Sequence, residues 1–130
     1  MREISLRTER RTQLVDITRQ VESALDGGGA AALVFVPHTT AGVTINEHAD
    51  PAVARDFERG LERMVADGWG WEHVEEGEEN APSHLRAALM SPQVLVPLRD
   101  GRLALGTWQG IFFCEFDGPR ERRVYVSALA

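Results

Sequence analysis

Apolar and polar positions alternate or cluster along the chain in a way that predicts many short strands. Residues 3–7 alternate, which is typical of an edge strand, and residues 13–16 predict a second strand. Residues 31–36 form a short, branched apolar run of the kind found in buried strands, and residues 42–45 predict the next strand. The carboxyl-terminal part is rich in strands, predicted at 94–98, 103–105, 111–116 and 123–128.

Start and stop signals between these strands predict three helices. The first is capped by Asp16 or Thr18 and ends at three glycines, 27–29. Its apolar face is formed by Ile17, Val21, Ala24 and Leu25. The second begins at Asp50, a capping residue followed by proline, and the third opens at residues 80–83. The third helix is expected to point Leu85, Ala88 and Leu89 inward.

Strands therefore flank and follow three helices, which predicts an α+β fold with mixed or antiparallel sheets. The 130 residues suit one domain, 1–130. The longest apolar run has seven residues, 30–36, far short of the ~20 needed to cross a membrane. Because the first residues lack an apolar signal core, we expect a cytoplasmic protein that does not associate with membranes.

Charge limits the possible chemistry. The net charge is −6, which argues against a dedicated nucleic-acid binder. All 14 basic residues are arginine, so lysine Schiff-base chemistry and a Walker lysine are excluded. Any bound phosphate must be held by arginine, backbone amides or a metal. The one cysteine, Cys114, alternates with two phenylalanines and is expected to be a core thiol.

Four segments carry candidate chemistry. His38 and His48 flank a predicted strand and could ligate a metal or move protons, or they could be surface histidines beside a threonine-rich turn. Residues 73–84 combine glutamates with a helix start that could hold phosphate, or they form a solvated acidic loop with an ordinary cap. Residues 106–110 bring two glycines together with Trp108, either as a ligand wall or as a structural bend. Arg120 follows a tight turn and could clamp phosphate, or it pairs with a surface carboxylate.

The four segments resemble the YjbQ-like family, also named secondary thiamine-phosphate synthase enzymes. The matching stretches are HTTAGVTINE at residues 38–47, HxxEGxxNAPSH at 73–84, GRLALGTWQ at 101–109 and EFDGPR at 115–120. Their order and gaps agree over nearly the whole chain. The resemblance implies helices against a two-sheet β arrangement, and a homotrimer with sheets packed around the threefold axis.

The resemblance also implies an activity, the joining of hydroxymethylpyrimidine diphosphate to thiazole phosphate with release of pyrophosphate. The implied partner is a small phosphorylated molecule, and the implied cofactor is a divalent metal, zinc or magnesium. The catalytic candidates are His38, Glu76, His84, Trp108 and Gln109. The phosphate-binding candidates are Thr39, Thr40, Asn80, Ser83 and Arg120, and the metal candidates are His38, His48 and His84.

Two other functions are compatible with these residues: a metal-assisted hydrolase, and a non-catalytic trimeric module that binds a metal or an anion. A three-histidine cluster with an open coordination position would favour catalysis. Histidines that lie apart in space would favour the binding module.

Overall fold

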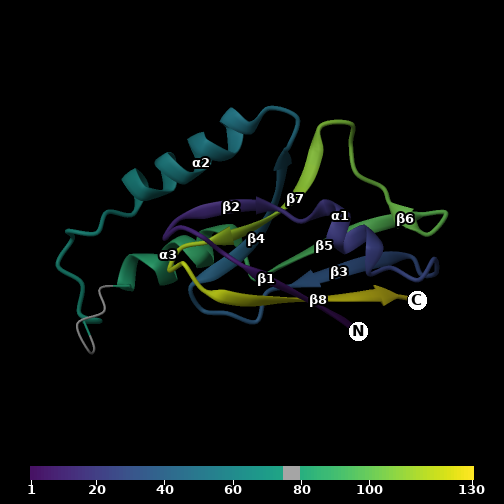
Figure 1. Ribbon diagram of the computed structural model, residues 1–130, viewed down its shortest axis with the longest axis horizontal. Coiled ribbons are helices and arrows are strands. Elements are labelled where there is room, and N and C mark those ends of the chain that lie inside the picture. Colours follow the sequence, from purple (N-terminus) through teal and green to yellow (C-terminus); the bar gives the residue numbers. More distant parts are fainter. Residues whose placement is uncertain (75–79) are drawn as a thin grey trace.

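Two antiparallel sheets face one another in the computed structural model, which describes residues 1–74 and 80–130 (Figure 1). The larger sheet has the strand order β1-β8-β3-β5-β6, and the smaller has the order β2-β7-β4. The strands are β1 (Arg2–Arg7), β2 (Gln13–Asp16), β3 (Ala31–Phe35), β4 (Ala41–Glu47), β5 (Gln93–Arg99), β6 (Arg102–Leu103), β7 (Gln109–Glu115) and β8 (Glu121–Leu129). The predicted α+β class is confirmed, and β1 lies at a sheet edge as expected.

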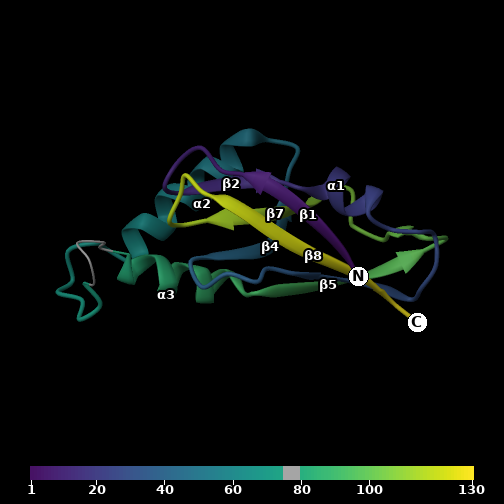
Figure 2. The ribbon, with the colours of Figure 1, turned by 60° about the horizontal axis from the view of Figure 1, so that its bottom comes forward.

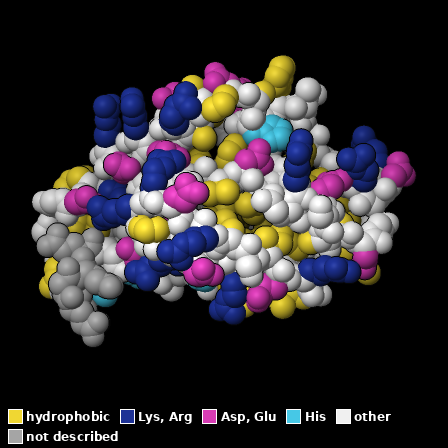
Figure 3. Space-filling view, in the orientation of Figure 1, with side chains coloured by type: hydrophobic (Ala, Val, Ile, Leu, Met, Phe, Trp, Pro, Cys, Tyr) yellow, Lys and Arg dark blue, Asp and Glu magenta, His cyan; other side chains and the backbone are white. Residues whose placement is uncertain are grey.

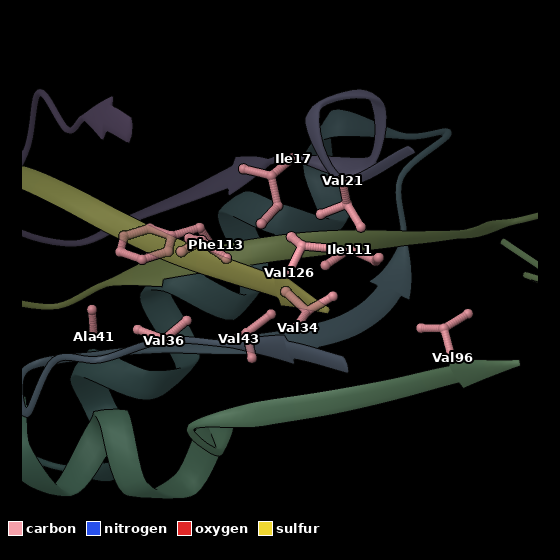
Figure 4. Packing of buried hydrophobic residues seen from close by; sticks show 11 residues of the cluster. Ile17, Val21, Val34, Val36, Ala41, Val43, Val96, Ile111, Phe113 and Val126 are labelled. Carbon is pink, nitrogen blue, oxygen red and sulfur yellow. The ribbon is translucent and has the colours of Figure 1, made fainter. Parts of the chain in front are cut away.

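The main core lies between the two sheets (Figure 4). Each strand of the larger sheet sends alternate side chains inward, such as Val34 from β3 and Val126 from β8, and these two are register partners. They meet Val43, Ile111 and Phe113 from the smaller sheet. This alternation is the period of two that the sequence carries in its strands.

Three helices complete the fold: α1 (Thr18–Ser23), α2 (Pro51–Met64) and α3 (Ala81–Met90). The start of α2 is as predicted, because the Asp50 side chain accepts a hydrogen bond from the Ala52 amide. Helices α2 and α3 lie on the outer face of the smaller sheet, over a second cluster that includes Leu14, Leu61 and Phe116. The predicted core thiol Cys114 is completely buried in this cluster, and burial raises its pKa.

The predicted inward face of α3 is wrong. Leu85 and Leu89 are 43% and 55% exposed, whereas Arg86 is only 1% exposed. The reason is the close approach of α3 to β4 at Gly42, where a Cβ atom would lie 2.9 Å from the carbonyl oxygen of Ala87. Because the backbones of α3 and β4 lie so close together, a small residue such as Ala87 faces the strand. Leu85 and Leu89 lie on the opposite, exposed side of the helix.

The outer face of the larger sheet carries apolar side chains without a helix over it. The main helix contacts are with the smaller sheet: α1 with β7, α2 with β2, and α3 with β4 and β7. Helix α1 also reaches the edge strand β6 of the larger sheet through Glu22. The larger apolar side chains on this outer face include Leu33, Phe35, Leu95, Tyr125 and Leu129. The rings of Phe35 and Tyr125 stack with centroids 6.5 Å apart. No helix within residues 1–74 and 80–130 is long and apolar enough to span a membrane.

Candidate functional site

The predicted site residues fall into two groups at opposite ends of the smaller sheet. In the β4–β7 pairing, Ala41 lies opposite Glu115 at one end and Glu47 lies opposite Gln109 at the other. Seven residues of extended strand cover about 20 Å. His38 comes just before β4, and His48 just after it. In Figure 1 the β3–β4 connection lies near α3, and the opposite end of β4 lies beside the start of β7.

The first group surrounds a buried ion pair that the sequence did not predict. Glu115 is completely buried, and Arg122 is 6% exposed. Arg122 Nε donates to Glu115 Oε1 at 2.8 Å and Nη2 donates to Oε2, while Thr8 Oγ1 donates to Oε1 at 2.7 Å. Burial pushes the pKa of Glu115 upward, but the hydrogen bonds from Arg122 and Thr8 outweigh it and hold that pKa below its usual value.

The two predicted threonines differ in what they contact. Thr40 is buried, and its hydroxyl accepts a hydrogen bond from Arg122 Nη2 at 2.8 Å. Its carbonyl oxygen accepts from the Phe116 amide. Thr40 therefore belongs to the buried ion-pair network, while Thr39 is exposed beside it.

His38 is held as a neutral hydrogen-bond acceptor. Its Nε2 accepts from the Arg123 amide at 2.9 Å, so the ring proton sits on Nδ1. Burial lowers the pKa of His38, and the nearby charge of Arg122 lowers it further. With the Nε2 lone pair in this hydrogen bond and a proton on Nδ1, the ring has no lone pair left for a metal ion.

The start of α3 is tied to the segment that follows β7. Ser83 is completely buried, and its hydroxyl donates to the Phe116 carbonyl oxygen. Asn80 Nδ2 donates to Asp117 Oδ2 at 3.1 Å, and Asn80 Oδ1 is buried without a partner. Ser83 was predicted to bind phosphate, but in this arrangement it fastens the helix to the sheet.

Arg120 takes the surface pairing that the sequence left open. Its Nη2 lies 2.9 Å from Asp117 Oδ2, and its Nε donates to the Asp117 carbonyl oxygen at 2.8 Å. A phosphate bound by Arg120 would have to displace this carboxylate.

The predicted three-histidine metal site does not form within one chain. His38, His48 and His84 all lie among the described residues, and no group of three or more potential ligands comes together there. His84 instead packs edge-on against His73, with ring centroids 5.2 Å apart. The seven-residue strand β4 separates His38 from His48. The predicted catalytic residue Glu76 lies outside the described residues.

The second group contains an oriented carboxylate–histidine dyad. His48 Nδ1 lies 2.9 Å from Asp16 Oδ2 and donates to it. The other oxygen, Asp16 Oδ1, accepts from the amide and the hydroxyl of Thr18 at 3.0 and 2.6 Å. Burial raises the pKa of Asp16, but the hydrogen bonds from Thr18 and His48 outweigh this and lower it. Both carboxylate oxygens are therefore occupied, and the second nitrogen of the imidazole is left to act on a ligand.

The backbone around the dyad is shaped to admit the imidazole ring. A Cβ atom on Gly110 would lie 2.4 Å from His48 Nδ1, so only glycine fits there. The His48 amide donates to the Trp108 carbonyl oxygen at 3.0 Å, and the Trp108 side chain is 64% exposed. Gln109 Oε1 accepts from the Gly106 amide, which closes the bend before β7. The glycine-bracketed segment is therefore a structural bend, one of the two predicted alternatives, and Gly110 borders His48.

Sequence reasoning missed Asp16, Glu115 and Arg122 as members of these groups. The sequence suggested Asp16 or Thr18 only as the cap of the first helix, but the N-cap of α1 is Ile17, and it has no side-chain capping hydrogen bond. The partner of Asp16, His48, is 32 residues away. Glu115 stands in one of the family-like stretches, but its burial was not predicted. The separation of His38 from His48 did have a signal, namely the predicted strand between them.

The comparisons with known proteins agree with the resemblance. The family described as UPF0047 protein YjbQ-like matches residues 2–130. The chain belongs to this family. It is 42% identical to the UPF0047 protein YugU of Bacillus subtilis, over 99% of this chain and 98% of YugU. It is also 44% identical to a UPF0047 protein of Archaeoglobus fulgidus, over 98% of this chain and 99% of that protein.

Solved structures of the family have the same fold. A YjbQ/UPF0047-family protein from Clostridium acetobutylicum is 45% identical, with a TM-score of 0.93 over 99% of this chain and all of that chain. A hypothetical protein from Aeropyrum pernix is 40% identical, with a TM-score of 0.91 over 98% of this chain and 96% of that chain. The chain therefore has the architecture of its family from end to end.

Proposed function

We propose that the protein is a phosphate-handling transferase that joins hydroxymethylpyrimidine diphosphate to thiazole phosphate. The observation that carries the proposal is the Asp16–His48 dyad, because an oriented imidazole on a surface is suited to moving a proton. The family resemblance supplies the substrate class. We place the protein in the cytoplasm, in agreement with a single cysteine that is buried rather than paired.

In the proposed reaction the bond between the pyrimidine methylene carbon and the diphosphate oxygen breaks, and that oxygen keeps the electron pair. The thiazole nitrogen supplies the electron pair for the new carbon–nitrogen bond. Protonated His48 donates its proton to the departing diphosphate, and Asp16 stabilises the imidazolium before transfer. No nucleophile from the protein is needed.

A protein-held zinc ion does not fit a single chain of this structure. Among the described residues the three predicted histidines do not come together as one ligand group, and the Nε2 lone pair of His38 already accepts a hydrogen bond. Magnesium is a different case, because it binds through substrate phosphates and keeps several waters. We therefore propose that magnesium enters with the diphosphate, and no step above depends on a protein-bound metal.

The test of this function is a turnover assay with both substrates and magnesium. We expect pyrophosphate and thiamine phosphate to form in equal amounts, and only when both substrates are present. The His48→Gln variant, purified in the same way, is the control for contaminating enzymes. Breakdown of the diphosphate substrate in the absence of thiazole phosphate would indicate a hydrolase. No turnover at all would favour the non-catalytic module that binds a metal or an anion.

We also propose that the protein is a homotrimer, with the uncovered outer face of the larger sheet buried between copies. Leu95 is 59% exposed on this face, beside Leu33 on β3. Contiguous apolar surface of this kind marks interaction sites.

Light scattering tests the assembly. We expect a mass about three times that of the 14.4 kDa chain. Leu95→Glu should shift the mass toward the monomer, because it introduces a charge into the buried face. The matched change Leu89→Glu, on the exposed side of α3, should leave the mass unchanged. A wild-type mass near that of one chain would refute the trimer.

A further inference from the structure

A hollow of about 540 Å³ lies between α1 and the β5–β6 hairpin. Its volume falls within the range of small-molecule pockets. Arginines from three separate elements line it: Arg19 from α1, Arg99 from β5 and Arg102 from β6. Leu103 and Leu105 add apolar walls.

The charged residues that line the hollow have a small positive balance, opposite in sign to the whole protein. The three arginines of the hollow face two acidic lining residues, Glu22 and Asp100, which leaves one net positive charge in a chain of net charge −6. Elsewhere basic and acidic side chains are interspersed, without a broad patch of one sign on the face shown in Figure 3. Arg102 Nε lies 2.9 Å from Glu22 Oε1. Within residues 1–74 and 80–130, Arg19 and Arg99 form no ion pair.

We infer that this hollow binds the diphosphate group of a small organic molecule. A guanidinium group can donate two parallel hydrogen bonds to the oxygens of one phosphate group. Because the chain has no lysine, arginine is the permanently charged side chain available to bind phosphate. A diphosphate carries more phosphoryl oxygens than a single phosphate and can accept hydrogen bonds from more of the lining arginines. The leucine walls suit the organic part of the ligand.

The hollow adjoins the dyad through Thr18. This residue lines the hollow, and its hydroxyl donates to Asp16, which in turn holds His48. The choice of a diphosphate ligand rests on the proposed function, and the site deepens that function by locating the leaving group near the proton donor. It also replaces Arg120, whose guanidinium is held by Asp117, as the expected phosphate contact.

Glu22 competes with the ligand for the hollow. Its carboxylate accepts hydrogen bonds from Arg102 Nε and from the Leu103 amide. A bound diphosphate would have to displace this carboxylate from Arg102 or tolerate its charge. Removal of the Glu22 charge should therefore strengthen binding.

Calorimetry with inorganic pyrophosphate, at fixed salt and without organic substrate, tests the site. We expect Arg19→Gln and Arg99→Gln each to weaken binding by about tenfold or more. Glu22→Gln should tighten it, and orthophosphate should bind more weakly than pyrophosphate. The matched controls are Arg7→Gln and Glu121→Gln, which remove one positive and one negative charge, respectively, as the hollow variants do. These two residues form an exposed ion pair between the last residue of β1 and the first residue of β8. Both should remain within twofold of wild type.

Three results would overturn the inference: no pyrophosphate binding by the wild type, equal effects of the hollow variants and their controls, or orthophosphate binding as tight as pyrophosphate. These failures are distinguishable from failure of the proposed function. If the wild type turns over its substrates and Arg99→Gln does so equally well, the hollow is rejected as the diphosphate site, but the transferase function is not. Pyrophosphate binding that depends on Arg19 and Arg99 without any turnover would reject the transferase alone.

Discussion

Arg122→Met is expected to lower the free energy of unfolding by about 3–5 kcal/mol, because it leaves the buried carboxylate of Glu115 without its charge partner. Thr8 and two backbone amides would still donate to Glu115, but none of them carries a charge. Urea denaturation at one fixed protein concentration measures the change.

Two further variants make this expectation specific. Arg7→Met removes an arginine from an exposed pair with Glu121 and should cost only about 0–1 kcal/mol. Adding Glu115→Gln to Arg122→Met should recover part of the loss, since it removes the unpaired charge. Equal stability of Arg122→Met and Arg7→Met would contradict the role assigned to the pair.

The Glu115–Arg122 pair should also make the free energy of unfolding decrease at acidic pH. The pKa of Glu115 is lower in the folded than in the unfolded protein, so the unfolded state binds the proton more readily. The stabilisation is therefore complete above the pKa of an unfolded glutamate, about 4.3, and is lost as the pH falls through the lowered folded value. Wild-type stability should decrease on this acid side.

His48→Gln is expected to reduce kcat of the proposed transferase by about 10²- to 10⁴-fold, which is the contribution typical of general acid–base catalysis. Glutamine keeps a polar side chain of similar size but cannot donate the required proton. Asp16→Asn should cause a smaller loss in the same direction, because the imidazole loses the carboxylate that orients it. Steady-state kinetics with both substrates provide the measurement.

The histidine at position 73 offers a matched control, since it is exposed and packs against His84 rather than the dyad. His73→Gln should leave kcat near the wild-type value. Wild-type kcat in His48→Gln, or equal losses in the two histidine variants, would remove the dyad from the mechanism.

Features that depend on near neighbours in the chain were predictable. The start of α2 at Asp50–Pro51 depends only on adjacent residues, because the Asp50 side chain caps the Ala52 amide and Pro51 suits the first helical position. Strand positions followed from alternation or, at residues 31–36, from a short branched apolar run, and the burial of Cys114 followed from its place among alternating phenylalanines. The inward face of α3 was not predictable in this way, because the approach of Gly42 decides which side chains fit beneath the helix.

The sequence by itself determined the α+β class, the order of the strands and helices, the exclusion of lysine chemistry and the family. Only the tertiary structure decided which polar side chains meet. Asp16 pairs with His48, Glu115 with Arg122 and Thr8, and Arg19, Arg99 and Arg102 converge on one hollow. These contacts depend on the packing of the sheets and helices, and for Glu115 and Thr8 the partners are 107 residues apart. Sheet register and packing are fixed by the whole core at once, so local patterns cannot specify them.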